Sequence, residues 1–311
     1  MKILVLGAGG VGGYFGGRLI EAGADVSFLV REKRAAQLRR DGLVVKSPFG
    51  DVRRPAKAVL AAGEGGPYDI VLLTCKAYDL ASALDAIAPA VERGAAVVPL
   101  LNGMAHLDAL EARFGGDKVM GGLCFVAATL NPEGEVLQLN AMLNGIVFGE
   151  RAGGISARGE GLFAAFKGVP VEARLSSEII GDMWAKWVQL ASLAALTCLM
   201  RANVGEVNHA AEGSAIGLGL LEECRAIAAA HGAEPSEKAM APMRTRLSDK
   251  SSTLSASMLR DIERGGPIEG EHIIGDLLRR GRAKGVEAPL LRIALAHLQA
   301  YEGKRAKAAS R

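Results

Sequence analysis

Short apolar runs alternate with amphipathic stretches along the first half of the chain. The runs lie at residues 3–6, 26–30, 69–74 and 95–100, and a helix is predicted through residues 18–22, between the first two. Runs that are apolar on both faces are typical of parallel strands that helices cover on both sides. The order of strand, helix and strand therefore predicts a Rossmann-like doubly wound N-terminal domain of the α/β class.

Between residues 118 and 174 the pattern changes to strand-like segments that turn residues separate. The segments lie at residues 119–129, 136–139, 146–148 and 169–173. The sequence Asn-Pro-Glu-Gly between the first two is a typical turn. We expect these strands to extend and complete the first sheet, with part of the pairing antiparallel.

After about residue 175 the strand pattern disappears and helical periods follow. The predicted helices are residues 176–200, 215–231, 254–264, 269–284 and 290–301. Three of them are followed directly by a glycine that can end a helix in a left-handed conformation, namely Gly232, Gly265 and Gly285. We therefore predict an all-helical C-terminal domain, followed by a frayed end that is rich in Lys and Ala.

The balance of charge excludes one class of partner. The 311 residues include 37 Lys and Arg against 34 Asp and Glu, a net charge of +3. So small an excess argues against a protein that binds nucleic acid through a basic surface. Half of the residues are hydrophobic, which is enough for the cores of two folded domains.

Cysteine and histidine usage indicates the compartment and argues against a built-in metal site. The four cysteines stand far apart without a C-x-x-C, which indicates free thiols in a reducing compartment. The five histidines include no H-E-x-x-H. The start of the chain lacks a signal-peptide cleavage site, and the longest apolar stretch, residues 188–200, is too short to span a membrane. We expect a soluble cytoplasmic protein without a membrane partner.

A G-x-G-x-x-G motif stands directly after the first predicted strand and opens a helix. Its residues are Gly7, Ala8, Gly9, Gly10, Val11 and Gly12. Gly7 permits the tight turn, Gly9 lets the backbone approach a pyrophosphate, and Gly12 lets the helix pack close to the strand. The helix N-terminus offers N–H groups and partial positive charge to the phosphates. The motif predicts a dinucleotide site, and a plain glycine-rich turn is the alternative.

The end of the second strand indicates which dinucleotide binds. An acidic residue there favours NAD through the ribose 2′-hydroxyl, but this chain has Arg31, with Lys33 and Arg34 nearby. A guanidinium can hold a 2′-phosphate with two hydrogen bonds, so we predict NADP(H) with Arg31 as the main contact. Glu32 leaves NADH open if it turns inward, and a solvated helix start is the structural alternative.

Two polar residues follow predicted strands at the edge where ligands bind in open α/β sheets. Lys76 comes after the third of these strands and can neutralise phosphate or order the nicotinamide side. Asn102 comes after the fourth and offers an amide to a carboxamide or a substrate carbonyl, with Gly103 allowing the turn. On spacing alone, a surface lysine and a turn-forming asparagine explain them as well.

Lys186 lies between Trp184 and Trp187 at the start of a long apolar helix. A nearby ammonium stabilises the alkoxide that hydride attack on a ketone creates, and can deliver its proton. Partial burial would lower the pKa of the lysine, whereas a lysine that extends along Trp into solvent is the alternative. Further along, Ser257 and Glu269 flank a helix stop, and the helix dipole alone explains Glu269.

Taken in this order, these pieces resemble the ketopantoate reductase (2-dehydropantoate 2-reductase) family. The resemblance extends over nearly the whole chain. It rests on the glycine motif, Lys76, Asn102-Gly103-Met104, Trp184-Ala185-Lys186 and the segment from Ser257 to Glu269.

The resemblance implies an NADP-binding Rossmann-like domain, residues 1–174, joined to a helical substrate and dimerisation domain, residues 175–311. The substrate would lie in the cleft between the two domains. Lys186 would be the general acid, and Asn102 would lie near both the nicotinamide and the substrate.

Further roles follow from the same resemblance. Lys76 and Glu269 would help to hold the cofactor, and Ala127 would contact it through its backbone. Ser257 would contact the carboxylate of a small 2-keto acid substrate. The implied reaction is the reduction of 2-dehydropantoate to (R)-pantoate, a step towards pantothenate and coenzyme A.

The chain departs from the family pattern at three substrate positions. Members carry asparagine four and eight residues after the lysine, where this chain has Leu190 and Ala194, and a further asparagine where it has Val204. A pocket with fewer amides selects a less polar substrate. Three nearby residues are candidates to replace the amides: Arg201, Asn203 and Asn208.

These departures leave two alternatives to 2-dehydropantoate reduction. One is an NADPH-dependent reductase of another, less polar 2-keto acid or ketone. The other is a non-catalytic NADP(H)-binding redox sensor, against which the retained Lys186, Ser257 and Glu269 argue. Both a monomer and a homodimer fit the sequence.

Overall fold

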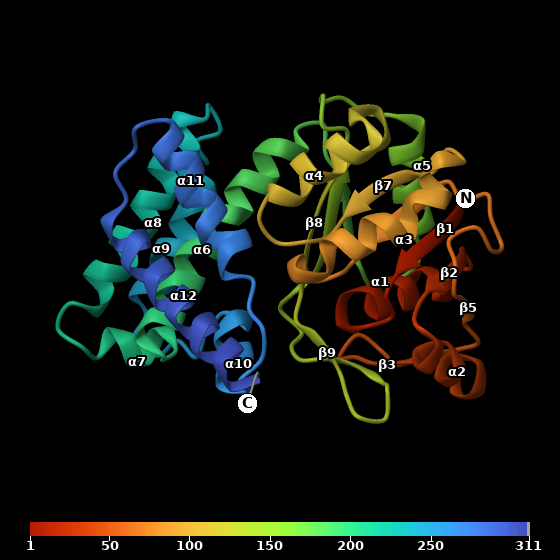
Figure 1. Ribbon diagram of the computed structural model, residues 1–311, viewed down its shortest axis with the longest axis horizontal. Coiled ribbons are helices and arrows are strands. Elements are labelled where there is room, and N and C mark those ends of the chain that lie inside the picture. The colour runs from red at the N-terminus through yellow and green to blue at the C-terminus, as the bar shows by residue number, and fades with distance from the viewer. Residues whose placement is uncertain (310–311) are drawn as a thin grey trace. The chain divides into compact units, whose positions relative to one another are not determined.

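The computed structural model describes residues 1–309, which form two compact units (Figure 1). The first unit contains residues 1–101 and 106–179, and the second contains residues 102–105 and those from 180 onward. The first is an α/β unit around a parallel sheet, and the second is helical. The predicted fold class is therefore confirmed.

Five parallel strands form the central sheet of the first unit, in the order β5-β2-β1-β6-β7. The strands are β1 (Lys2–Leu6), β2 (Asp25–Leu29), β5 (Lys57–Val59), β6 (Ile70–Leu73) and β7 (Ala96–Pro99). Ile3 pairs with Val26 on one side and with Ile70 on the other, and all three are buried because helices cover the sheet. The carboxyl ends of the strands share one edge, where the glycine motif and Lys76 follow their strands.

The helices of this unit follow the strands that the sequence predicts. They are α1 (Gly10–Glu21), α2 (Glu32–Asp41), α3 (Leu80–Glu92), α4 (Ala105–Phe114) and α5 (Ala157–Ala165), with short 3-10 turns at η1 (Ala77–Asp79) and η2 (Gly116–Lys118).

The remaining strands form two further sheets, so the expectation that they complete the first sheet was wrong. One sheet has the order β4-β3-β10-β9 and the other β12-β11-β8. Their strands are β3 (Leu43–Lys46), β4 (Val52–Arg54), β8 (Gly121–Val126), β9 (Ala128–Leu130), β10 (Val136–Gln138), β11 (Asn144–Gly149) and β12 (Glu172–Leu175). Only an isolated bridge between Val97 and Val119 joins the central sheet to this region in the described residues. Part of the pairing is antiparallel, as predicted.

The glycine-rich face of α1 explains where the four-stranded sheet goes. A Cβ on Gly13 would lie 2.5 Å from the Val136 side chain, and one on Gly17 would lie 2.8 Å from the Val45 side chain. The missing side chains let β10 and β3 pack directly on the helix. These strands therefore cover α1 instead of extending the central sheet, which local strand patterns do not reveal.

A fully buried arginine fixes the same region. The Arg18 side chain, 0% exposed, donates to Ser47 Oγ and to the Gly50 carbonyl, each at 2.8 Å, and pairs with Glu21 at 2.7 Å. Ser47 Oγ in turn donates to Gln138 Oε1 at 2.6 Å. A buried charge is tolerated only when it is paired and hydrogen-bonded, so this network ties α1 to the loop after β3 and to β10.

In the residues that the structure describes, the second unit contains helices joined by loops and no strand. Its elements are α6 (Ile179–Met200), α7 (Val204–Asn208), α8 (Gly213–Ala230), α9 (Glu237–Ser248), α10 (Ser257–Glu263), η3 (Glu271–Gly275), α11 (Asp276–Ala283) and α12 (Pro289–Ala309). The sequence missed α7 and α9. It also did not reveal that η3 is a π-helical turn at the start of the predicted helix 269–284. Gly232, Gly265 and Gly285 each have φ of 70°, as predicted for helix ends.

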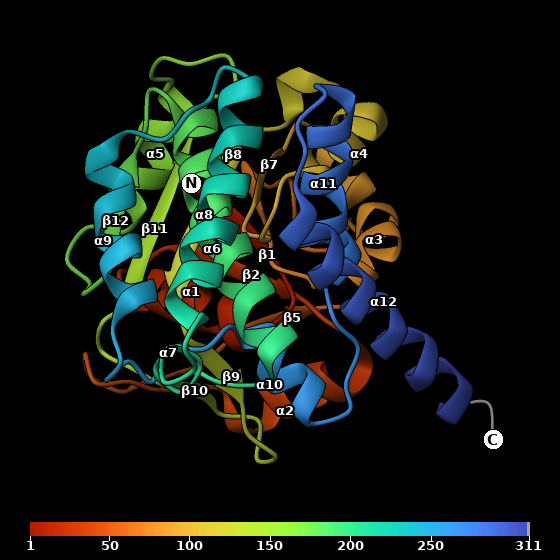
Figure 2. The same ribbon diagram turned by 90° about the vertical axis from the view of Figure 1, so that its left-hand side faces the viewer.

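The predicted fraying after residue 303 is corrected by the structure. Helix α12 continues without a break to Ala309 (Figure 2), and residues 310 and 311 lie outside the described residues. Alanine and lysine are good helix formers, so the same composition continues the helix that precedes it.

Helix α6 also corrects the membrane argument from the sequence. Its 22 residues extend well before the apolar run at 188–200, and by length and composition alone it meets the criteria for a membrane span. Its most apolar window is 61% buried inside the protein. A core helix has the same composition, so this single helix is weak support for a membrane span.

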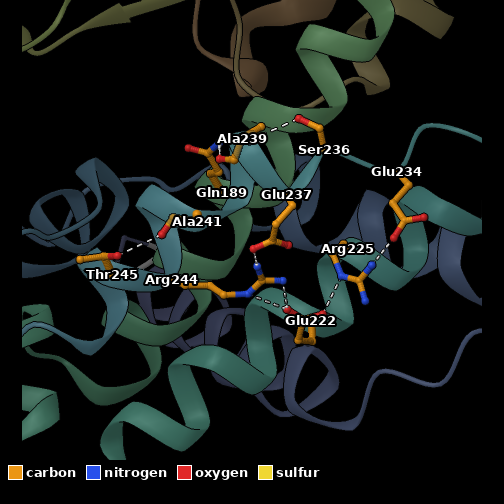
Figure 3. A network of polar contacts seen from close by, with 10 residues as sticks. All are labelled: Gln189, Glu222, Arg225, Glu234, Ser236, Glu237, Ala239, Ala241, Arg244 and Thr245. Atoms are coloured by element: carbon orange, nitrogen blue, oxygen red, sulfur yellow. Dashed lines mark hydrogen bonds and ion pairs between the residues drawn. The ribbon is translucent and has the colours of Figure 1, made fainter.

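Ion pairs connect α8 with α9 at the surface of the helical unit (Figure 3). Glu222 on α8 contacts Arg244 on α9 at 2.8 Å and Arg225 on its own helix at 2.6 Å. Arg225 also pairs with Glu234, and Arg244 with Glu237. Exposed pairs of this kind are each worth about 0–1 kcal/mol, so the network mainly sets the orientation of α9 on α8.

Candidate active site

The three glycines of the motif serve different purposes in the first unit. Gly7 has φ of +90°, which favours glycine. A Cβ on Gly12 would lie 2.3 Å from the Gly7 carbonyl oxygen and 2.4 Å from Thr74 Oγ1, so Gly12 is required by packing. A Cβ on Gly9 would meet nothing within 4 Å. Gly9 is the N-cap of α1, so the motif leaves open space where a phosphate can approach helix N–H groups.

The segment around Ala127 closes one side of this turn. A Cβ on Gly10 would lie 2.4 Å from the Ala128 carbonyl oxygen, so β9 lies directly against the start of α1. Ala127 precedes β9, and its own carbonyl accepts a hydrogen bond from Leu139 N–H at 2.7 Å. The structure therefore brings the backbone next to Ala127 beside the glycine turn, although the two segments are far apart in the sequence.

Two arginines at the start of α2 have different surroundings. Arg31 is the N-cap residue and its side chain is exposed. Arg34 is half-buried: Nε and Nη2 donate to the Ala8 carbonyl at 3.1 and 2.7 Å, and Nη1 donates to Gln37 Oε1 and the Gly134 carbonyl, both at 2.7 Å. Burial lowers the pKa of Arg34. The structure thus uses Arg34 to bind the glycine turn to the β9–β10 turn, a role that sequence reasoning missed.

Lys76 lies at the same strand edge. It is the N-cap residue of η1, two residues after Thr74, whose hydroxyl donates to the Leu6 carbonyl at 2.6 Å. This bond joins the ends of β6 and β1. Lys76 therefore follows the strand that lies next to the one carrying the glycine motif.

In the helical unit the structure brings together Lys186 and Asn102, which are 84 residues apart. Lys186 Nζ donates to Asn102 Oδ1 at 3.1 Å. Asn102 follows β7, and Gly103 beside it has φ of 75°, the conformation that the turn requires. An amide oxygen that accepts from an ammonium fixes the direction in which that ammonium points.

Glu269 is almost fully buried, with 7% of its surface exposed. Its backbone carbonyl accepts from Ile273 N–H at 2.9 Å in the π-helical turn η3. Burial lowers the pKa of the neighbouring His272. The carboxylates of Glu269 and Asp276 and a hydrogen bond with the Asn102 backbone raise the pKa of His272 and oppose that effect. Sequence reasoning missed His272, for which the only signal was its position three residues after Glu269.

Ser257 is placed differently. It is the first residue of α10 and its side chain is exposed. Among the described residues the structure shows no hydrogen bond from Ser257 to Lys186 or Asn102. The start of α10 is nevertheless fixed to α6, because Ala256 N–H donates to Thr197 Oγ1 at 3.3 Å.

Comparison with known proteins places this arrangement in a family. The chain matches the family models "Ketopantoate reductase PanE/ApbA" over residues 3–153 and "Ketopantoate reductase PanE/ApbA C terminal" over residues 178–302. The chain belongs to the ketopantoate reductase family. The resemblance inferred from the sequence is confirmed.

One relative and two solved structures show the range of this similarity. YkpB of Bacillus subtilis, an uncharacterized oxidoreductase, is 37% identical over 98% of this chain and 100% of its own length. A PanE/ApbA family ketopantoate reductase from Ralstonia eutropha JMP134 has the same fold with a TM-score of 0.87, at 27% identity over 98% of this chain and 99% of its own. A D-mandelate dehydrogenase, solved with NADH and anilino(oxo)acetate, has a TM-score of 0.85 at 22% identity over 98% of this chain and 99% of its own. At this identity the likeness shows a shared fold only.

The three positions where the family resemblance led us to expect amides have apolar residues. Leu190 is half-buried one turn after Lys186, and Ala194 and Val204 are buried at 1% and 0% exposure. Leu190 lies at i+4 from Lys186 and therefore on the same face of α6. This position next to the ammonium is therefore apolar, whereas Gln189 at i+3 donates its amide to the Ala239 carbonyl at 3.1 Å.

The residues considered as replacements for these amides are engaged elsewhere or exposed. Asn203 and Glu206 form a capping box at the start of α7, with bonds of 2.9 and 2.8 Å. Asn208 is buried and donates to the carbonyls of Leu247 and Asp249 at 2.9 and 3.2 Å. Arg201 is exposed at the end of α6. The Asn208 amide is therefore engaged through both its nitrogen and its oxygen, and the Asn203 side-chain oxygen is engaged in the helix cap.

The cysteines and metal-binding side chains add no second chemistry to this site. All four cysteines are free thiols, and burial raises the pKa of Cys198 to about 12. In residues 1–309, no three His, Cys, Asp or Glu side chains are grouped to hold a metal ion.

Proposed function

We propose that the chain is an NADPH-dependent reductase of a small 2-keto acid. When bound, NADPH supplies a hydride to the carbonyl carbon, and the Lys186 ammonium gives a proton to the carbonyl oxygen, so that the ketone becomes a secondary alcohol. The single observation that carries the proposal is the 3.1 Å hydrogen bond from Lys186 Nζ to Asn102 Oδ1. This bond orients a cation at the turn that follows β7, where open α/β sheets bind their ligands.

The residues of the first unit fit the cofactor. The open space at Gly9 and the uncovered N-terminus of α1 suit a pyrophosphate. We assign the 2′-phosphate to Arg31, which is exposed at the start of α2 and is not held as Arg34 is. Lys76 and the backbone at Ala127 are assigned to the cofactor as well. On the helical unit we assign Glu269 to the cofactor and Ser257 to the substrate carboxylate.

The first candidate substrate is 2-dehydropantoate, which is reduced to (R)-pantoate by the activity that gives the family its name. A second candidate is a less polar 2-keto acid. It is favoured by the apolar residues Leu190, Ala194 and Val204 and by the engagement of Asn203 and Asn208 in hydrogen bonds of their own. A pocket that lacks amides at these three positions offers fewer hydrogen bonds to the hydroxyl group of 2-dehydropantoate.

A substrate panel tests the proposal and separates the two candidates. Oxidation of NADPH is followed by absorbance with 2-dehydropantoate and with 2-keto acids that carry branched or aromatic side chains. Turnover of any of them that disappears in Lys186→Ala, with NADPH binding retained, supports the reductase. Tight NADPH binding without turnover of the whole panel would instead support a redox sensor.

The compartment and the partners of the protein are proposed from its thiols and its net charge. The four free thiols suit a reducing cytoplasm, and the net charge of +3 does not favour nucleic acid. We propose a cytoplasmic monomer or homodimer, which sedimentation of the purified chain would distinguish.

A further inference from the structure

His272 lies beside the turn that presents Asn102. A Cβ on Gly103 would lie 3.1 Å from the His272 carbonyl oxygen and 3.2 Å from ring atom Cδ2, with Nε2 at 3.5 Å. The ring also hydrogen-bonds with the Asn102 backbone, and this bond raises the pKa of His272. A bond that favours the protonated ring is one in which the ring N–H donates to a carbonyl. His272 therefore donates to the Asn102 carbonyl, and Nε2 is the nitrogen nearest this turn.

The turn that carries His272 is fixed on α6 next to Lys186. Trp187, 1% exposed, donates from Nε1 to the Ile273 carbonyl at 3.0 Å. Lys186 and Asn102 are the two partners of one hydrogen bond, and consecutive residues of η3 contact both sides of it. Ile273 binds Trp187 on the helix that carries Lys186, and His272 binds the backbone of Asn102. A π-helical turn is costly and is often found at functional sites, and here it is what presents both contacts.

We propose that His272 is a positioning residue for Lys186, and that its ring holds the Asn102 backbone so that the amide oxygen keeps the ammonium directed at the substrate carbonyl. The inference rests on the proposed reductase function. His272 does not contact Lys186 directly in this scheme. It acts through Asn102, so its loss changes the step that needs the proton and leaves NADPH binding nearly unchanged.

The protonation state of His272 matters for this role. The charged groups that act on it are the carboxylates of Glu269 and Asp276 and the guanidinium of Arg279. Burial outweighs the carboxylates and lowers the pKa of His272 below its ordinary value, so the ring is neutral at pH 7. Protonation at lower pH would put a charge on a half-buried ring, which desolvation disfavours.

Two substitutions at His272 test the role of the N–H donor. His272→Gln keeps an amide N–H at about the position of Nε2, whereas His272→Met keeps an unbranched side chain without a donor. We expect His272→Met to lower kcat about tenfold, the effect of one lost hydrogen bond, and to change the KM for NADPH less than about twofold. We expect His272→Gln to retain kcat within about threefold. Equal losses of kcat in the two variants would overturn the proposal.

A second measurement does not depend on turnover. The NMR signal of the Lys186 ε-methylene, assigned by its absence in Lys186→Arg, reports the environment of the ammonium. It should shift in His272→Met and stay in place in His272→Gln. The matched control is His209→Met, since the His209 ring also contacts a backbone carbonyl, that of Gly205, at 2.8 Å. An unmoved signal in His272→Met would overturn the positioning role, whereas a moved signal without turnover of any substrate would contradict only the proposed function.

Discussion

Gly9 and Gly12 offer a matched pair of alanine substitutions that separates ligand approach from packing. The new Cβ in Gly12→Ala would lie 2.3 Å from the Gly7 carbonyl oxygen and 2.4 Å from Thr74 Oγ1, whereas the new Cβ in Gly9→Ala would meet nothing within 4 Å. Gly9 has φ of −85° and ψ of −156°, an extended conformation that alanine adopts. Both residues lie at the start of α1, so the two variants differ mainly in what the new methyl group meets.

The structure gives the size of the expected effects. At Gly12 the new Cβ meets a backbone carbonyl oxygen, so overpacking lowers the free energy of unfolding by about 3 kcal/mol. The better helix propensity of alanine offsets about 1 kcal/mol of this loss. A net loss of about 2 kcal/mol lowers Tm by about 4–8 °C for a domain of this size. At Gly9 alanine is a poorer N-cap, which lowers the free energy of unfolding by about 0.5–1 kcal/mol. Alanine also reduces the conformational entropy of the unfolded chain, which raises the free energy of unfolding by about 0.4–1 kcal/mol. The stability of Gly9→Ala should therefore equal that of the wild type.

Affinity for NADPH should follow the opposite order. The methyl group of Gly9→Ala fills the space where the pyrophosphate approaches, and the loss of one close contact of about 1.4 kcal/mol is a tenfold weaker Kd. The assays are thermal unfolding without cofactor and NADPH fluorescence titration at a temperature where both variants are folded. Unchanged affinity in Gly9→Ala, or a Tm loss in Gly9→Ala as large as that in Gly12→Ala, would refute the reasoning.

Three further predictions concern single side chains. Arg31→Ala should weaken NADPH binding at least about tenfold more than NADH binding, and equal losses in the two titrations would remove the 2′-phosphate contact. Asn208→Ala should lower Tm, because it removes the bonds to the Leu247 and Asp249 carbonyls and leaves the buried Leu247 partner unsatisfied, at a cost of about 1–3 kcal/mol. The value of kcat should stay unchanged, and a lower kcat at unchanged Tm would indicate that Asn208 contacts the substrate. Burial lowers the pKa of His272, so the free energy of unfolding should be greatest above the unfolded value of about 6.5 and should fall as pH drops through about 6.5 towards the folded value. Urea unfolding across this range should show a smaller fall in His272→Gln.

The architecture and the nucleotide motif could largely be predicted from the sequence, because both depend on local patterns. Buried parallel strands are continuous apolar runs, helices repeat about every 3.6 residues, and Gly7 marks a turn that needs positive φ. The sequence also supplied Lys186 and Asn102 as separate candidates. Strands β3, β4 and β5 were missed because each is short and includes charged residues, so none of them forms an apolar run.

Only the tertiary structure decided which of these residues lie together. Packing between distant segments brings Lys186 within 3.1 Å of Asn102, places His272 against Gly103, and makes Arg34 donate to the Ala8 carbonyl. It also places Asn208 in a hydrogen-bond network of its own. A local pattern records the periodicity and turn geometry of one segment, whereas a hydrogen bond between residues 84 apart depends on how the whole unit folds.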